Sequence, residues 1–203
     1  MHEAVLSWVG QFRTLDDLSV LDIGGRDLNG SPRMFFPNAS PYHVLDLRPG
    51  PNVDIVADAA EWRPALGSAG RPWYDLAICT EVFEHTQAWP EILATAYAAL
   101  RPGGWLIFTC AGPGRPAHSG IEAVPGLIDG EHYANVSPQQ IESELRGQGW
   151  MEIETHLRGT DTQGKAVKPV TPRDHLRVAL DMPPVEPREV LMGAVLSRTS
   201  VAG

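Results

Sequence analysis

The sequence predicts an α/β fold in which helices cover both faces of a doubly wound, mostly parallel sheet. Three observations lead to this prediction. Five short runs are rich in β-branched and other apolar residues, as buried parallel strands are. Polar residues close these runs, at the sheet edge where such folds bind ligands. Helix patterns lie before the first run and between the fourth and fifth. The runs are residues 20–25, 42–46, 53–58, 75–79 and 105–108.

The remaining elements follow from local signals. Residues 4–12 carry apolar side chains at helical spacing, which predicts a helix packed against the sheet. Pro90 can occupy the first turn of a helix that ends near Leu100. Ser137 and Gln140 resemble a capping box that opens another helix, and residues 150–156 are expected to form a sixth strand.

The segment 158–189 is rich in proline, glycine and charge, which predicts a loop or lid beside the last strands. Residues 171–174 can begin a short helix within it. A final strand is expected at 190–196. With no internal repeat or linker visible, we expect residues 1–203 to form a single domain.

Composition excludes several classes of function. A formal net charge of −9 disfavours nucleic-acid binding, because phosphate contacts require clustered Lys and Arg. The chain has no apolar stretch long enough to cross a membrane and no recognisable leader, so a cytoplasmic location is expected. Its two cysteines, Cys79 and Cys110, lie near the ends of predicted core strands and are expected to be small buried hydrophobes.

The polar ends of the first two runs predict a cofactor that contains adenosine. Gly24 and Gly25 form a turn in which the backbone can approach a ligand, because a Cβ is absent. Asp46 closes the next run, where a carboxylate can accept both hydroxyls of a ribose.

These motifs, in this order, resemble those of the class I S-adenosylmethionine-dependent methyltransferases. The resemblance extends from about Leu18 to Trp150 and includes the stretches 74–85 and 100–106, the latter reading Leu-Arg-Pro-Gly-Gly-Trp-Leu. It implies a seven-stranded sheet of the Rossmann-like methyltransferase type whose last strand is antiparallel. We also expect the glycines of the second stretch to end the preceding helix in a left-handed cap, with the proline preventing its continuation.

The resemblance assigns parts of the cofactor to particular residues. Asp22, Gly24 and Gly25 correspond to the turn that holds the methionine end, Asp46 to the ribose-binding acid, and Asp58 with Ala59 to the pair that binds adenine. The other candidate contacts to S-adenosylmethionine are Gly30, Leu47, Thr80 and Glu81.

The first loop departs from the family pattern, because residues 24–30 lack the usual alternation of glycines. Asn29 and Gly30 could supply a second backbone turn. Arg26 or Arg33 could pair with the cofactor carboxylate through a forked hydrogen bond, and a solvated surface role is the alternative for each.

Methyl transfer to a hydroxyl needs a group that removes the hydroxyl proton. His85 is the first candidate, because a histidine titrates near neutral pH and this one follows the fourth predicted strand. Glu84 and His132 are the other candidates for catalysis. His118 could bind substrate, although an exposed loop position is its simpler interpretation.

The same residues suggest an alternative. Glu81, Glu84, His85 and His132 resemble the Glu-x-x-Glu-His motif and distal His with which small-RNA ribose methyltransferases bind a divalent metal. Ubiquinone-pathway O-methyltransferases have a shorter form of the motif. No metal is predicted as a resident cofactor, because the Glu-His pair could equally serve in packing.

The predicted function is therefore methyl transfer from S-adenosylmethionine to a small-molecule acceptor, with a hydroxyl as the expected accepting group. An NAD-type dinucleotide-dependent oxidoreductase is the first alternative, but the third glycine of its fingerprint is missing. A non-catalytic cofactor-binding module is the second.

Overall fold

The computed structural model describes residues 3–15, 17–64, 74–122 and 124–171. The chain divides into two compact units, Met1–Pro169 and Val170–Gly203, and every described helix and strand lies in the first. Residues 172–203, which include most of the expected 171–174 helix start and the whole 190–196 strand, lie outside the described residues. The expectation of a single domain over 1–203 stays a prediction.

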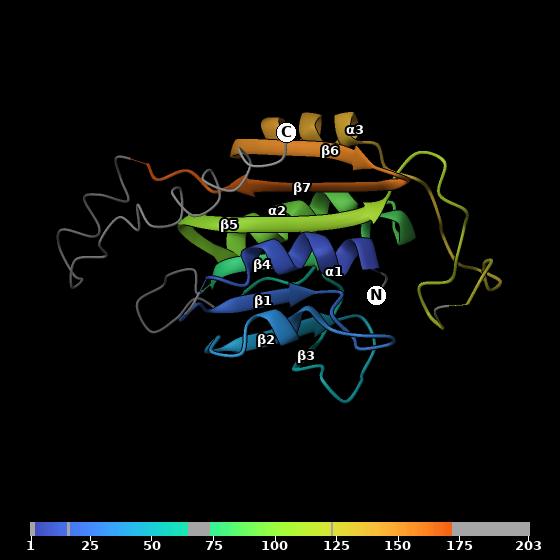
Figure 1. Cartoon of the computed structure of the whole chain (residues 1–203), viewed down its shortest axis with the longest axis horizontal. Coiled ribbons are helices and arrows are strands. Elements are labelled where there is room, and N and C mark those ends of the chain that lie inside the picture. Colours follow the sequence, from blue (N-terminus) through green and yellow to red (C-terminus); the bar gives the residue numbers. More distant parts are fainter. Residues whose placement is uncertain (1–2, 16, 65–73, 123, 172–203) are drawn as a thin grey trace, which may run out of the picture. The chain divides into compact units, whose positions relative to one another are not determined.

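The first unit is built on a seven-stranded sheet (Figure 1) with the order β3-β2-β1-β4-β5-β7-β6. Strands β1 to β5 pair in parallel, and β7 is antiparallel to both β5 and β6. The strands are β1 (Val20–Ile23), β2 (Tyr42–Asp46), β3 (Ile55–Val56), β4 (Tyr74–Thr80), β5 (Leu100–Ala111), β6 (Met151–Arg158) and β7 (Asp161–Val167).

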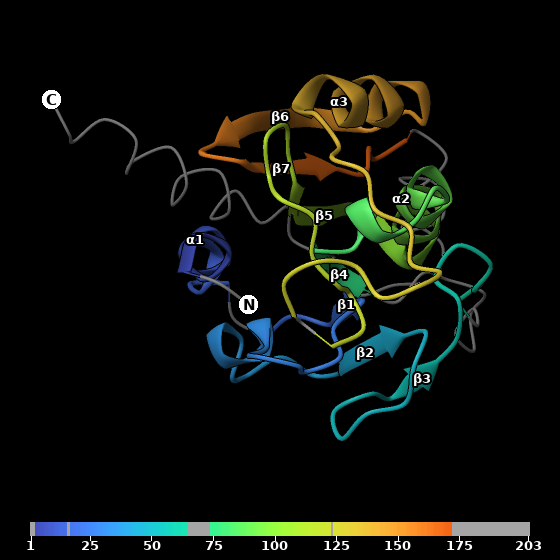
Figure 2. The same ribbon diagram turned by 90° about the vertical axis from the view of Figure 1, so that its right-hand side faces the viewer.

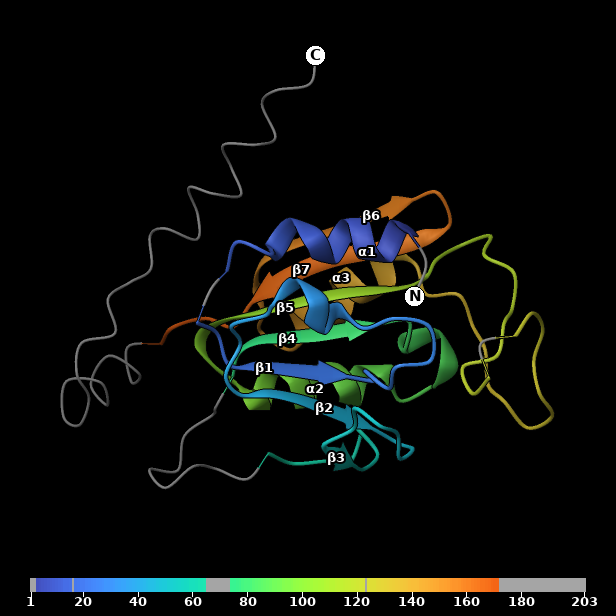
Figure 3. The same ribbon diagram turned by 60° about the horizontal axis from the view of Figure 1, so that its bottom comes forward.

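Helices cover both faces of this sheet, as Figures 2 and 3 show. Helices α2 (Trp89–Ala99) and α3 (Pro138–Gly147) share one apolar core with the sheet, which includes Leu93 and Ile141. Helix α1 (Glu3–Val9) lies on the opposite face, where the Trp8 indole packs edge-on against His156 of β6. The described residues also form the short 3-10 helices η1 (Gly10–Phe12), η2 (Pro32–Phe35) and η3 (Phe83–His85). The predicted doubly wound fold is confirmed.

Local signals determine where the helices begin. Pro90 lies in the first turn of α2, as predicted. Helix α3 begins with a complete capping box, in which the Ser137 hydroxyl accepts from the Gln140 backbone N–H while the Gln140 side chain accepts from the Ser137 N–H. Two N–H groups that the helix itself cannot satisfy are thereby paired.

The expected loop or lid at 158–189 is wrong for its first part, because residues 161–167 form β7 between β5 and β6. The sequence does not predict β7 as a strand, because this segment is not apolar: Thr162, Gln163 and Lys165 are polar and nevertheless buried. Gly164 is required at its centre, because a Cβ there would meet the Phe108 ring and lie 2.5 Å from the Glu154 carbonyl oxygen.

The expected left-handed cap after α2 is also wrong. Leu100, the residue that follows the helix, is extended (φ −77°, ψ 144°) because it already pairs with Tyr74 of β4 and is fully buried. The positive φ of +78° falls later, at Gly103, whose N–H donates to the Lys168 carbonyl. Leu-Arg-Pro-Gly-Gly therefore begins a strand directly.

Both cysteines are free and buried, as expected. Within the described part of the chain, no helix is both long enough and apolar enough to cross a membrane.

Candidate functional site

An open cavity of about 900 Å³ lies at the carboxyl ends of the central parallel strands, beneath the long connection from β5 to α3. This is the edge at which open α/β sheets bind ligands. Most of the residues predicted from the sequence line it: Gly24, Gly25, Gly30, Asp46, Leu47, Asp58, Ala59, Thr80, Glu81, His85 and His132. Asp22 and Glu84 do not line it, because both side chains are completely buried.

The turn after β1 needs both of its glycines. Gly24 has a φ of +71°, and a Cβ there would collide with the Val82 side chain. A Cβ on Gly25 would collide with the Asp22 carboxyl group directly beneath it. The bare backbone of this turn therefore forms one wall of the cavity.

Asp22 supports this turn from below. The Tyr42 hydroxyl donates a 2.8 Å hydrogen bond to Asp22 Oδ2, whereas Oδ1 is buried without a partner among the described residues. Burial raises the pKa of Asp22 to about 7, and the Tyr42 hydrogen bond opposes that rise. Asp22 is completely buried beneath the turn, and its predicted role at the methionine end of the cofactor stays a prediction.

Asp46 and Asp58 stand at the ends of β2 and β3. The two oxygens of Asp46 each accept one backbone N–H, from Arg26 at 3.2 Å and from Arg48 at 2.9 Å. Asp58 Oδ1 accepts the Ala60 N–H at 2.9 Å. A carboxylate offers about four acceptor positions, so these bonds orient both groups and leave capacity for a ligand.

The two arginines of the first loop are placed differently. Arg26 lines the cavity, and its Nη2 donates to the Ile121 carbonyl at 2.8 Å. The Arg33 guanidinium lies over the Tyr42 ring, 5.0 Å from its centroid. Of the two, only Arg26 faces the cavity.

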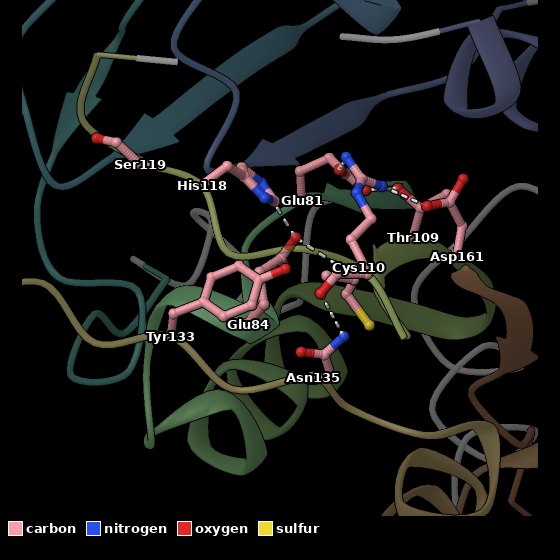
Figure 4. Close-up of polar contacts among 12 residues, drawn as sticks. Glu81, Glu84, Thr109, Cys110, His118, Ser119, Tyr133, Asn135 and Asp161 are labelled. Atoms are coloured by element: carbon pink, nitrogen blue, oxygen red, sulfur yellow. Dashed lines mark hydrogen bonds and ion pairs between the residues drawn. The ribbon is translucent and has the colours of Figure 1, made fainter. Parts of the chain in front are cut away.

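Glu81, which follows β4 directly, is held in a left-handed backbone conformation with a φ of +59°. Its carboxylate accepts the Thr109 hydroxyl at 3.1 Å and pairs with Arg115 at 2.9 Å (Figure 4). Arg115 also pairs with Asp161 at the start of β7. This network fixes the end of β4 to the β5–β7 pair, and a non-glycine residue at positive φ persists only where its surroundings hold it.

Three aromatic side chains meet beside the cavity, and two of them, His85 and His118, line it. The rings of His85, His118 and Tyr133 pack edge to face, with centroids 5.0 to 5.6 Å apart. Burial, together with the nearby His118, lowers the pKa of His85 to about 4, so this imidazole is neutral at physiological pH. Its Nδ1 is buried without a hydrogen-bond partner among the described residues.

Glu84 lies beneath these rings and is inaccessible to solvent. One oxygen accepts the Ala111 N–H at 3.0 Å and lies 3.9 Å from His118 Nε2 (Figure 4), while the other has no partner in the described part of the chain. Burial, with the charge of Glu81 as a lesser cause, raises the pKa of Glu84 well above its usual value. Glu84 cannot touch a substrate from this position.

The residues that could hold a metal ion differ from the predicted set. Glu84, His85 and His118 each offer one ligand atom, and these atoms lie within 4.8 Å of one another. Glu81 and His132 are not part of this group, although both line the cavity. The fold brings His118 rather than His132 next to Glu84, because the connection after β5 passes directly over η3.

Sequence reasoning missed several residues of the site. Tyr42 is the first residue of an apolar strand, and no local signal shows that its hydroxyl reaches Asp22. Arg115, Glu131 and Tyr133 lie in the β5–α3 connection, where periodicity gives no information about contacts. The paired placement of His85 and His118 does have a signal, since both follow predicted strands that are neighbours in the sheet.

Comparison with known proteins decides the family. A family described as a methyltransferase domain matches residues 3–159, which is most of the chain. The chain belongs to this methyltransferase-domain family. The resemblance to class I S-adenosylmethionine-dependent methyltransferases and the fold that it implied are both confirmed.

Curated relatives carry the name ubiquinone biosynthesis O-methyltransferase. The protein from Burkholderia ambifaria (strain MC40-6) is 30% identical over 125 residues, which are 62% of this chain and 50% of that protein. The protein from Burkholderia thailandensis is also 30% identical over 125 residues, with the same coverage. This chain thus matches about half the length of these methyltransferases.

Solved structures of methyltransferases share the fold at low sequence identity. The Burkholderia thailandensis 1,6-didemethyltoxoflavin-N1-methyltransferase, with S-adenosylhomocysteine bound, has a TM-score of 0.57 and 16% identity, covering 82% of this chain and 76% of that one. Phosphoethanolamine N-methyltransferase 2 of Haemonchus contortus, in complex with S-adenosylmethionine, has a TM-score of 0.59 and 16% identity, covering 81% and 52%.

Proposed function

We propose that this chain transfers the methyl group of S-adenosylmethionine to a hydroxyl of a small-molecule acceptor. One observation carries the proposal. The same cavity joins a glycine turn and two carboxylates, Asp46 and Asp58, to the paired imidazoles of His85 and His118. Methyl transfer needs a cofactor site and an acceptor site next to each other. We call the glycine turn with the two carboxylates the cofactor half of the cavity, and the region of the two imidazoles the acceptor half.

The residues of the first half fit the cofactor. Gly25 leaves room over Asp22 that a Cβ would fill, so the backbone of the turn can lie against the methionine end. Asp46 is oriented by two backbone N–H groups and retains acceptor positions for the ribose hydroxyls. Asp58 and Ala59, at the end of β3, are the contacts that we propose for adenine.

The second half suits an acceptor with an apolar body and a hydroxyl. Leu28 and Val124 line the cavity although each is more than 40% exposed, so an apolar ligand there would cover them. The rings of His85 and His118 offer polar atoms among aromatic surfaces. A hydroxyl is preferred to an amine because the curated relatives are named as O-methyltransferases, while the amine-methylating neighbours share only the fold.

For methyl transfer to a hydroxyl, the protein has to align the acceptor oxygen with the methyl group and to remove the hydroxyl proton. When bound, S-adenosylmethionine supplies an electrophilic methyl group that joins the acceptor oxygen as its bond to sulfur breaks. His85 is neutral at physiological pH, so a ring nitrogen can accept a hydrogen bond from the acceptor hydroxyl and take its proton as the methyl group is transferred, although the pKa of about 4 makes this imidazole a weak base. The cavity walls hold the acceptor for in-line attack, which is where most of the rate enhancement arises.

A methyl-transfer assay tests this proposal. Wild-type protein, S-[methyl-³H]adenosylmethionine and a panel of hydroxylated aromatic compounds are incubated, and each compound is matched by its methyl ether and by its amine analogue. The proposal expects label in hydroxyl compounds alone, and strong loss of labelling in His85→Ala. Arg146→Met, which alters an exposed salt bridge on α3, is the matched control and should transfer as the wild type does.

Label in the amine analogues alone would contradict the hydroxyl as acceptor. Reduction or oxidation of a nicotinamide dinucleotide by the same protein would favour the oxidoreductase alternative. Tight cofactor binding with no transfer to any acceptor would favour the non-catalytic module.

A further inference from the structure

The segment from Arg115 to His132 covers the cavity, and we call it the strap. It contributes His118, Gly120 and Ile121 to the cavity wall. The described residues of the strap belong to no strand of the sheet and to no helix. The strap is held by side-chain contacts and by local backbone hydrogen bonds, such as that from the Ser119 N–H to the Val124 carbonyl.

Glu131 makes most of the side-chain hydrogen bonds that hold one part of the strap to another. Its Oε1 accepts from the Ser119 hydroxyl at 2.9 Å and from the N–H groups of Gly120 and Ile121 at 3.1 and 3.2 Å. Its Oε2 accepts from the Ile128 N–H at 2.7 Å. These bonds fold the strap locally, but they do not fix it to the cofactor half of the cavity.

Arg26 supplies one connection to that half at the middle of the strap, and the Arg115–Glu81 ion pair supplies another at its start. Its Nη2 donates to the Ile121 carbonyl at 2.8 Å, across a sequence separation of 95 residues. Its stem lies against Gly50, where a Cβ would come within 2.9 Å of Arg26 Cγ, and its backbone N–H donates to Asp46 Oδ2. Arg26 therefore touches the proposed ribose-binding carboxylate with its backbone and the strap with its side chain.

The strap in turn positions His85. Gly120 is adjacent to Ile121 and packs on the His85 imidazole so closely that a Cβ on it would lie 2.9 Å from Cγ of the ring. A shift of Ile121 would move Gly120 and open space over that ring. One chain of contacts thus runs from Asp46 through Arg26, Ile121 and Gly120 to His85.

We propose that Arg26 is a positioning residue, which holds the strap closed over the acceptor half and so adjusts acceptor binding without serving as a cofactor ligand. The expected effect on turnover rests on the proposed function. The expected closure of the strap rests on the contacts of Arg26 alone. Arg26 lies in the first loop, residues 24–30, which lacks the family's usual alternation of glycines. A glycine at this position would have no side chain to donate to the Ile121 carbonyl.

The test combines hydrogen exchange with kinetics in Arg26→Met, Arg26→Lys and the control Arg146→Met. In the unliganded protein, amides of residues 117–122 should exchange about tenfold faster in Arg26→Met, the factor expected for loss of one charge-assisted hydrogen bond. Arg26→Lys, which keeps a cationic donor, should be intermediate. Arg146→Met should exchange as the wild type does.

In turnover, Arg26→Met should raise the KM for the acceptor more than it lowers kcat. Its affinity for S-adenosylhomocysteine should stay near that of the wild type, because the backbone bond to Asp46 is retained. Unchanged exchange at 117–122 would overturn the proposal. Loss of S-adenosylhomocysteine affinity equal to the loss in acceptor kcat/KM would also overturn it, since Arg26 would then be a cofactor ligand.

The exchange measurement needs no substrate. If the wild type transfers no methyl group while Arg26→Met still releases the strap, the proposed function fails and the assignment of Arg26 to the strap stands.

Discussion

Replacing Asp22 by Asn tests how the buried carboxyl beneath the glycine turn affects stability. The change removes a charge but keeps an oxygen that can accept from Tyr42. Because Asp22 is fully buried, its pKa in the folded protein is raised from 3.8 to about 7. The folded state therefore binds a proton that the unfolded state has already released between these two pH values.

The sign and size of the effect follow from this difference. Protonated Asp22 contributes most to stability below pH 3.8, and that contribution falls as the pH rises toward 7, beyond which the loss is complete. A shift of this size corresponds to about 4 kcal/mol, of which roughly 2.5 kcal/mol is lost between pH 5 and pH 8. The amide that replaces the carboxyl group does not titrate. The free energy of unfolding of Asp22→Asn, relative to wild type, should therefore increase by roughly 2.5 kcal/mol over this interval.

Urea denaturation followed by tryptophan fluorescence at pH 5, 6, 7 and 8 measures this difference. Other groups that titrate in this range are present in both proteins, so their contributions to the difference cancel. Tyr42→Phe is a useful companion, because loss of the donor to Asp22 should move the pH-dependent interval upward. If Asp22→Asn and wild type differ by the same amount at pH 5 and pH 8, the buried carboxyl does not titrate between them and the predicted pKa shift is wrong.

Three further predictions concern single contacts. Ser137→Ala removes the capping box of α3 and should cost about 1 kcal/mol in urea denaturation, with Ser137→Asp restoring most of it. Gly25→Ala places a Cβ on the Asp22 carboxyl group and should abolish S-adenosylhomocysteine binding measured by calorimetry, whereas Gly147→Ala, a site with nothing within 4 Å, should bind normally. Arg115→Met breaks the ion pairs with Glu81 and Asp161 and should lower the free energy of unfolding by about 2 kcal/mol; a loss below about 0.5 kcal/mol would show that these pairs are screened.

Much of the fold can be predicted because local and global signals agree in it. The apolar run at 42–46 predicts β2 with its observed bounds, since buried parallel strands are apolar throughout and Asp46 ends the run. The capping box of α3 is equally visible in the sequence, because all of its partners lie within four residues. Gly24 and Gly25 indicate the first turn, since their lack of a Cβ is itself the structural requirement.

The failures have a common physical cause, which is that tertiary contacts outweigh local pattern. Gln163 and Lys165 give β7 a polar sequence, but Lys165 is buried because it pairs with Glu154 and lies over the Trp105 ring. In the candidate site, the sequence alone favours His132 over His118, and only the course of the strap shows which of them faces Glu84. Contacts between residues far apart in the chain, such as Arg26 with Ile121, leave no trace in local sequence.

Binding of S-adenosylmethionine in the cavity through Asp46 underlies every functional proposal for this chain, and calorimetric titration measures it. Wild-type protein is titrated with S-adenosylmethionine, S-adenosylhomocysteine and NAD, alongside Asp46→Asn and the exposed control Glu91→Gln on α2. We expect one site for the first two ligands, a loss of about tenfold in Asp46→Asn from weakened ribose hydrogen bonds, and no change in Glu91→Gln. Absence of binding by both S-adenosyl compounds, tighter binding of NAD, or equal affinity in Asp46→Asn and wild type would show that the cavity does not bind the cofactor in this way.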